Sequence, residues 1–118
     1  LYWMAVRSAL SMSHHKVDQW DPYTLDDPFS SYQDAMLHLL QLNLDPFEAD
    51  TAIMITPEYK IRSIQGMVTN FHMPKSTLLL LVHAVVGNDW KTIYDHALRK
   101  DYRFLSFGDS SLLFCKKK

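Results

Sequence analysis

The residues best suited to chemistry lie in one polar stretch, residues 69–77, which reads Thr-Asn-Phe-His-Met-Pro-Lys-Ser-Thr. This stretch runs from the end of an expected strand into an apolar helix. The N–H groups and the positive dipole end of a helix N-terminus favour an anion such as phosphate or carboxylate. Lys75 adds a full positive charge, His72 can exchange a proton near neutral pH, and Asn70 can orient a ligand.

A structural role suits the same residue types, and composition alone favours it. Ser76 would then cap the helix, Asn70 would be a turn residue, and His72 would be a loop histidine with satisfied hydrogen bonds.

A second stretch, residues 102–109, offers Arg103 and Asp109 as ligand contacts on a strand followed by a turn. The planar guanidinium of arginine suits a carboxylate or a phosphate. A plain surface strand with a Gly-Asp turn is again the structural alternative.

Metal and redox chemistry find little support in the sequence. His14 and His15 are adjacent, so on a helix they would point about 100° apart. The other histidines show no ligand spacing with Cys, Asp or Glu, and we expect no metal site. The single cysteine, Cys115, excludes an internal disulfide and fits a reducing, cytoplasmic compartment.

Charge is distributed unevenly along the 118 residues, although the net charge is only -1. Residues 17–59 carry nine acidic residues and no Lys or Arg, whereas residues 60–118 carry ten basic and four acidic residues. This balance excludes a strongly basic nucleic-acid binder on net charge alone. Either both halves are simply solvated, or the second half meets a polyanion. The longest apolar run, residues 78–82, is too short to span a membrane.

Hydrophobic periodicity and turn residues predict a mixed α and β fold, in one domain or a piece of one. Helices are expected over residues 1–14, 31–43, 77–86 and 89–98, the second of them capped by Ser31 with Asp34. Residues 17–29 are expected to be irregular. Strands are expected over residues 51–56, 59–64, 67–71, 102–107 and 111–115.

The two polar stretches resemble the S-adenosylmethionine:tRNA ribosyltransferase-isomerase family of queuosine biosynthesis. That family carries Thr-Asn-Phe-His-Leu-Pro-Lys-Ser-Thr-Leu-Leu, from which this chain departs only at Met73. Residues 102–109 resemble its Tyr-Arg-Phe-Phe-Ser-Tyr-Gly-Asp. Upstream, Glu58 stands where the family's Pro-Gly-Tyr has glycine, which puts that turn in question. The resemblance is firm over residues 51–113.

Leu1-Tyr2-Trp3 resembles the helix that follows the family's Thr-Thr-Ser-x-Arg-Thr-Leu-Glu-Ser motif, which would lie just before Leu1. The resemblance therefore implies that residues 1–118 are a C-terminal portion of the catalytic domain. The larger fold that it implies is a two-domain, barrel-like α/β enzyme.

The implied reaction transfers the ribosyl group of S-adenosylmethionine to 7-aminomethyl-7-deazaguanine in tRNA and isomerises it to epoxyqueuosine. Adenine and methionine leave, and no metal is implied. The resemblance makes His72 an acid, base or leaving-group donor and Asn70 an orienting group. Lys75 would bind an anion together with the N–H groups of Ser76 and Thr77. The remaining residues expected to bind substrate are Thr69, Phe71, Arg103 and Asp109.

Two alternatives stay open: an RNA-binding module without catalysis, and a purely structural truncated piece. The gene upstream of Leu1 distinguishes them, because the enzyme requires the Thr-Thr-Ser motif there and a free-standing module requires an initiator Met. The 118 residues alone are expected to be inactive. Unpaired strand edges make self-association of such a piece plausible.

Overall fold

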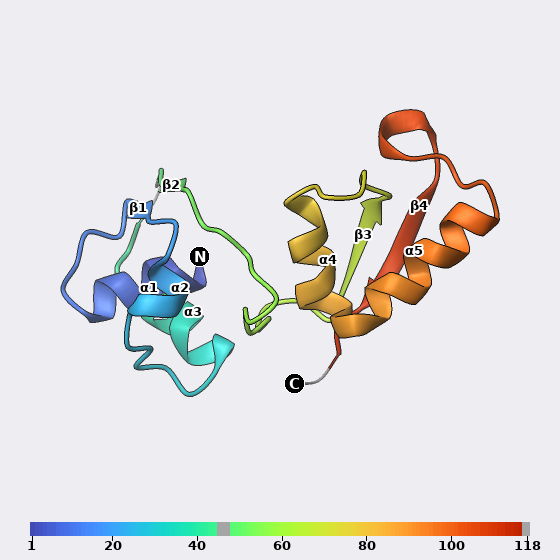
Figure 1. Cartoon of the computed structure of the whole chain (residues 1–118). Helices are drawn as coiled ribbons and strands as arrows, with labels where there is room; N and C mark the ends of the chain where they lie inside the picture. The colour runs from blue at the N-terminus through green and yellow to red at the C-terminus, as the bar shows by residue number, and fades with distance from the viewer. Residues whose placement is uncertain (45–47, 117–118) are drawn as a thin grey trace. The chain divides into compact units, whose positions relative to one another are not determined.

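The computed structural model describes residues 1–44 and 48–116. The chain forms two compact units, residues 1–54 and 55–118, each containing helices and short strands (Figure 1). This confirms the mixed α and β fold. The described residues include four helices of eight residues or more, one short helix and two 3-10 turns.

The first unit is built on two helices that pack against each other, and two very short strands lie beside them. The inward face of the first helix is apolar, with Trp3, Met4 and Val6 buried. The hydroxyl of Ser31 accepts the N–H of Asp34 at 3.1 Å, which confirms the predicted helix cap. The elements of this unit are α1 (Tyr2–Ala9), β1 (Lys16–Val17), α2 (Asp21–Thr24), α3 (Tyr32–Gln41) and β2 (Asp50–Thr51).

Three predictions for this unit need correction. The first helix ends at Ala9 instead of residue 14, because Ser11 takes a left-handed backbone conformation with φ 59°. The expected irregular segment contains the short helix α2 and, at its start, part of β1. Residues 51–56 are not a buried strand: only Thr51 belongs to a strand, β2 pairs in parallel with the equally short β1, and both residues of β2 are exposed.

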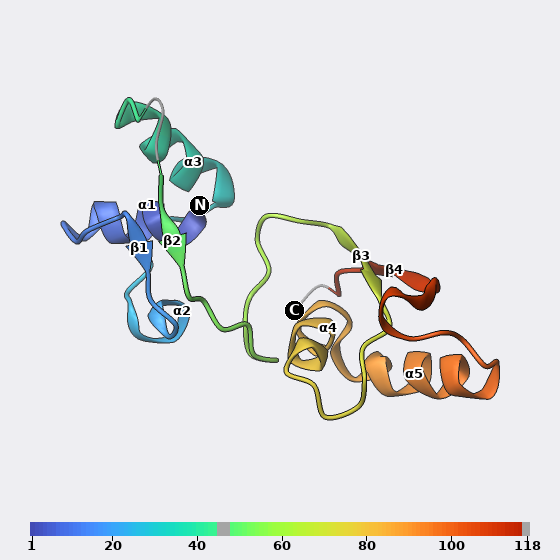
Figure 2. The ribbon, with the colours of Figure 1, turned by 90° about the horizontal axis from the view of Figure 1, so that it is seen from above.

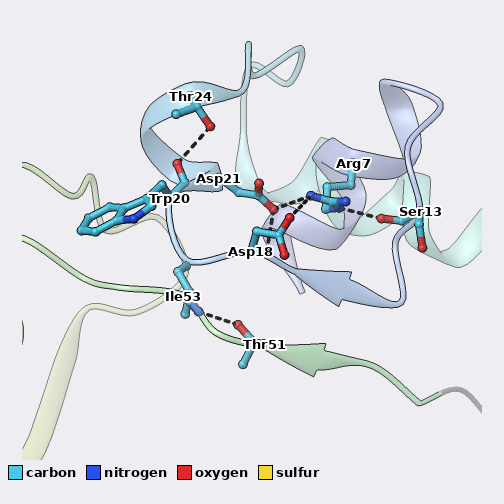
Figure 3. A network of polar contacts seen from close by, with 8 residues as sticks. All are labelled: Arg7, Ser13, Asp18, Trp20, Asp21, Thr24, Thr51 and Ile53. Atoms are coloured by element: carbon cyan, nitrogen blue, oxygen red, sulfur yellow. Dashed lines mark hydrogen bonds and ion pairs between the residues drawn. The ribbon is translucent and has the colours of Figure 1, made fainter.

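A buried ion pair joins α1 to the chain around α2, as Figure 3 shows. The guanidinium of Arg7 donates to Asp21 at 2.8 Å and, through Nε, to the carbonyl of Ser13 at 2.6 Å. The same Asp21 oxygen accepts the N–H of Asp18 at 2.9 Å. A second carboxylate, that of Asp18, lies 3.5 Å from Nη1 of Arg7 but is largely exposed. Because Arg7 and Asp21 are both buried, removing Asp21 would leave the charge of Arg7 only partly compensated.

The second unit consists of a two-stranded antiparallel sheet with two helices against one of its faces. Seen from above, α4 and α5 lie on the same side of the strands (Figure 2). The elements are β3 (Gly66–Asn70), α4 (Leu78–Val86), η1 (Gly87–Asp89), α5 (Trp90–Arg99), η2 (Leu105–Phe107) and β4 (Ser110–Phe114).

Strand alternation divides the sheet into an inner and an outer face. Leu113 on the inner face is buried against the core formed with Phe71, Val82 and Tyr94. The outer face is apolar yet open, since its large side chains are 62% to 71% exposed: Val68, Leu112 and Phe114. Register places Val68 opposite Leu112.

Four predicted elements of this unit are confirmed to within a few residues: the β3 strand, the β4 strand and the helices α4 and α5. Two expected strands are wrong. Residues 59–64 hold no strand, and the carbonyl of Lys60 accepts the Arg62 guanidinium instead. Residues 102–107 hold no strand either: residues 102–104 are irregular and residues 105–107 form η2. Leu105 adopts φ 59°, and its N–H donates to the carbonyl of Phe71.

We expect Asp21→Ala to lower the free energy of unfolding by about 3 kcal/mol, because the buried charge of Arg7 would lose its buried partner and keep only the longer contact with the exposed carboxylate of Asp18. The matched control is Asp26→Ala, at an exposed carboxylate, which should change stability by less than about 0.5 kcal/mol. Urea unfolding followed by far-UV circular dichroism measures both. Equal effects of the two substitutions would contradict a structural role for the ion pair.

Candidate functional site

The two polar stretches singled out from the sequence meet at one end of the β3–β4 sheet. Residues 71–77 leave the end of β3, and residues 103–109 enter the start of β4, so both loops lie at the same end of this unit (Figure 1). A direct hydrogen bond joins them: the N–H of Leu105 donates to the carbonyl of Phe71 at 2.7 Å. The two loops, which are far apart in the sequence, are therefore in direct contact in the structure.

The Phe71 ring is the apolar anchor of this junction and is only 3% exposed. Its centroid lies 5.4 Å from Tyr94, 5.6 Å from Tyr102 and 5.8 Å from Phe104, each edge to face. Such contacts add about 0.5 to 1.5 kcal/mol each beyond the area buried. Phe71, expected to contact substrate, is thus a core residue in this structure.

His72 follows directly and is held at two points. Its backbone N–H donates to the hydroxyl of Tyr94 at 3.0 Å, and its ring Nε2 lies 3.0 Å from Oγ1 of Thr69. The ring is half-buried, and its Nδ1 has no partner among the described residues. A histidine with one nitrogen fixed and one open can exchange a proton with a ligand.

Tyr94 was not foreseen as part of the site. The helical stripe of α5 predicted a buried residue here, but nothing in the sequence indicated which backbone group its hydroxyl would bind. Burial raises the pKa of Tyr94 by desolvating the phenolate, and the hydrogen bond from the N–H of His72 acts in the opposite direction. The folded state therefore favours the neutral form of the Tyr94 side chain.

Asn70 and Thr69 occupy the last two positions of β3. Asn70 is exposed on the outer face and lies opposite Ser110 of β4. The carbonyl of Thr69 accepts the hydroxyl of Ser111 at 3.3 Å. The side chains of Thr69 and Asn70 therefore lie on opposite faces of the strand, and only that of Thr69 contacts His72.

The N-terminus of α4 uses several of its N–H groups internally. The Ser76 hydroxyl accepts the N–H of Leu78 at 3.2 Å, from the position before the N-cap residue Thr77. Its own N–H donates to the carbonyl of Met73 at 3.2 Å. Thr77 precedes the helix without a side-chain capping bond. Lys75 is exposed and has φ 66°, a left-handed conformation in which lysine is uncommon.

Arg103 and Asp109 bind each other and close the second loop. The backbone N–H of Arg103 donates to Oδ2 of Asp109 at 2.5 Å, and its Nε lies 3.5 Å from the same oxygen. Gly108 between them has φ 130°, and a Cβ there would lie 3.0 Å from Nη2 of Arg103. The Arg103 side chain is 67% exposed, so the ion pair contributes little stability by itself.

Comparison with known proteins identifies the family to which these loops belong. A family model described as "Queuosine biosynthesis protein" matches residues 29–113, which include both loops and the sheet. Because this match covers well over half of the chain, the chain belongs to the queuosine biosynthesis protein family.

Several curated relatives are similar to this chain and share one name, S-adenosylmethionine:tRNA ribosyltransferase-isomerase. The protein of Rhizorhabdus wittichii is 58% identical over 69 residues, which cover 58% of this chain and 20% of the relative. That of Jannaschia sp. is 46% identical over 90 residues, covering 75% of this chain and 23% of the relative. The match thus spans about a fifth of these relatives' length. No solved structure matches the chain.

Two further observations bear on ligands and environment. Within residues 1–44 and 48–116, no three His, Cys, Asp or Glu side chains form a group able to hold a metal ion. In the same residues, every helix is too short or too polar to cross a bilayer.

Titration of Tyr94 tests its burial in the core. The neutral phenol is favoured in the folded state, so its contribution to stability is intact below about pH 10 and is lost as the pH rises through the raised folded-state pKa. Absorbance at the phenolate band should therefore contain a late component from Tyr94. This component should be absent from Tyr94→Phe and should remain in Tyr23→Phe, at an exposed tyrosine. A Tyr94→Phe curve that keeps the full wild-type amplitude at high pH would contradict the burial of Tyr94.

Proposed function

We propose that this chain forms part of the active site of an S-adenosylmethionine:tRNA ribosyltransferase-isomerase. The observation that carries the proposal is the hydrogen bond between Phe71 and Leu105, which brings together the two loops that resemble this family's motifs. Membership in the queuosine biosynthesis protein family supports the reaction class, and the contact between the two loops supports the location of the site.

The proposed reaction moves the ribosyl group from S-adenosylmethionine, the co-substrate, to 7-aminomethyl-7-deazaguanine in tRNA. Isomerisation of the sugar gives epoxyqueuosine, and adenine and methionine are released. The step requires a group that takes or gives a proton beside the sugar or the departing adenine. His72 has a suitable geometry, since Thr69 and Tyr94 fix it while Nδ1 stays open. Asn70, exposed at the strand end, would orient the substrate.

Anionic groups of the substrates would meet the cations at this end of the sheet. Lys75 and Arg103 are both exposed, and the unit from residue 55 onward carries ten basic and five acidic residues, a net charge of +5. The N–H groups of Ser76 and Thr77 would add to Lys75, although that of Ser76 must first leave the carbonyl of Met73. Asp109 would contact the donor's amine or hydroxyls.

The remaining features of the proposal concern the whole protein. Because the chain spans about a fifth of its relatives, we expect the 118 residues alone to form no epoxyqueuosine. A cytoplasmic location follows from a tRNA substrate. Self-association of the isolated chain would bury the open outer face of the sheet, formed by Val68, Leu112 and Phe114.

The same charge also favours a second candidate, an RNA-binding module without chemistry. Both functions predict tRNA contact, and only the first predicts release of adenine. An activity measurement therefore separates them.

The test places this chain in a full-length framework. We would replace the aligned segment of the Rhizorhabdus wittichii relative with this chain's residues and measure adenine release and epoxyqueuosine formation on tRNA by mass spectrometry. The chimera should be active, and His72→Ala should lower kcat by about 100-fold or more, the usual contribution of a proton-transfer group.

The control is His96→Ala, at an exposed histidine of α5, which should leave kcat within about threefold. A folded chimera without activity would remove the enzymatic proposal. An active chimera with undiminished His72→Ala turnover would remove His72 from the reaction.

A further inference from the structure

The loop that carries Arg103 and Asp109 displays an aromatic ring to solvent. Phe107 of η2 is 72% exposed, whereas Phe104, three residues earlier, packs its ring on Phe71 and Tyr94. Exposing a large aromatic side chain forfeits its burial free energy, about 1.5 to 3 kcal/mol. An exposed ring at the end of the sheet that carries the candidate site is therefore a candidate for binding a ligand.

The backbone around Phe107 is held in one shape. Leu105 on one side has φ 59° and is tied to Phe71, and Gly108 on the other has φ 130°. The carboxylate of Asp109 closes the loop by accepting the N–H of Arg103. A ring displayed on a loop fixed at both ends loses little conformational freedom when it binds a flat partner.

Two basic side chains belong to the loops at this end of the sheet. The Arg103 guanidinium packs beside Gly108, the residue that follows Phe107, and remains largely exposed. Lys75 is exposed on the loop that leaves the end of β3, where Asn70 pairs with Ser110 at the start of β4. An exposed aromatic ring flanked by basic side chains is the combination that binds unpaired nucleotides, because the ring stacks on the base and the cations pair with phosphate.

The other exposed apolar surface of this unit differs in chemistry. Val68, Leu112 and Phe114 form a continuous apolar strip on the outer face of the sheet, and no basic side chain of β3 or β4 interrupts it. Such a strip suits another protein surface. Phe107 differs, because the guanidinium of Arg103 lies beside the next residue, Gly108.

We propose that Phe107 is a stacking platform for an unpaired base of the RNA substrate, with Arg103 and Lys75 contacting the adjoining phosphates. This inference rests on the proposed function and deepens it by naming a contact of the RNA. Adenine of S-adenosylmethionine has the same flat shape, but that molecule has no phosphate and carries a cationic sulfonium, so the flanking charges favour RNA.

The experiment measures binding of an anticodon stem–loop RNA to the 118-residue chain by fluorescence anisotropy at fixed, moderate salt. Phe107→Leu should weaken binding about tenfold, the loss typical of one base–aromatic stack. Phe107→Tyr should restore affinity to within about twofold of wild type. Lys75→Gln should reduce the salt dependence of binding by about one unit of log–log slope.

The matched control is Phe114→Leu, which removes an equally exposed ring from the outer face of the sheet. It should leave RNA affinity within about twofold of wild type. A second arm replaces the RNA with S-adenosylmethionine, measured by calorimetry, and Phe107→Leu should not alter that binding.

Each other outcome overturns a definite statement. RNA binding that is equal in wild type and Phe107→Leu removes the stacking platform and leaves the proposed function intact. Equal losses from Phe107→Leu and Phe114→Leu indicate unspecific apolar contact and also remove it. A loss confined to S-adenosylmethionine assigns the ring to the donor. A folded chain that binds no stem–loop RNA contradicts the inference and the RNA part of the proposed function together, whereas adenine release by the chimera would still stand.

Discussion

The candidate site depends on one residue, Phe71, which acts through both its ring and its backbone. The ring closes an edge-to-face cluster with Tyr94, Tyr102 and Phe104, while the carbonyl accepts the N–H of Leu105. The ring stabilises the core through apolar burial, and the hydrogen bond fixes where the second loop crosses the first. Pairing of Asn70 with Ser110 already places the two loops at the same end of the sheet, and the junction at Phe71 holds them in contact.

The contacts of Phe71 also determine where the neighbouring residues of the candidate site lie. The residue after Phe71 is His72, whose backbone is bound by Tyr94 from the same cluster and whose ring is bound by Thr69 from the same strand. The residue after Leu105 leads into the turn that displays Phe107. Core packing therefore positions the ionisable and aromatic groups, and the charged residues around them remain in solvent, where they can meet an anionic substrate.

Local signals predicted the elements with strong periodicity or capping. The stripe of α5, the apolar run of α4 and the cap of Ser31 all depend on residues a few positions apart, and all were confirmed. Residues 102–107 alternate like a strand, but the hydrogen bond from Leu105 to Phe71 and the left-handed backbone of Leu105 end this pattern, and residues 105–107 form η2. The sequence also indicated two polar loops as the candidate site, and the structure brings these loops into contact. The role of Tyr94 was not predictable, because its hydroxyl binds a backbone group that lies 22 residues away.

The central claim is that Phe71 joins the two loops through a lasting hydrogen bond. Native-state hydrogen exchange of the Leu105 amide, followed by NMR on the 118-residue chain, tests it most directly. We predict that this amide exchanges as slowly as the Leu113 amide of the β3–β4 sheet, within about tenfold, since both would open only with the core. Exchange of Leu105 at the rate of an unprotected loop amide, with Leu113 still protected, would show that the loops are not joined.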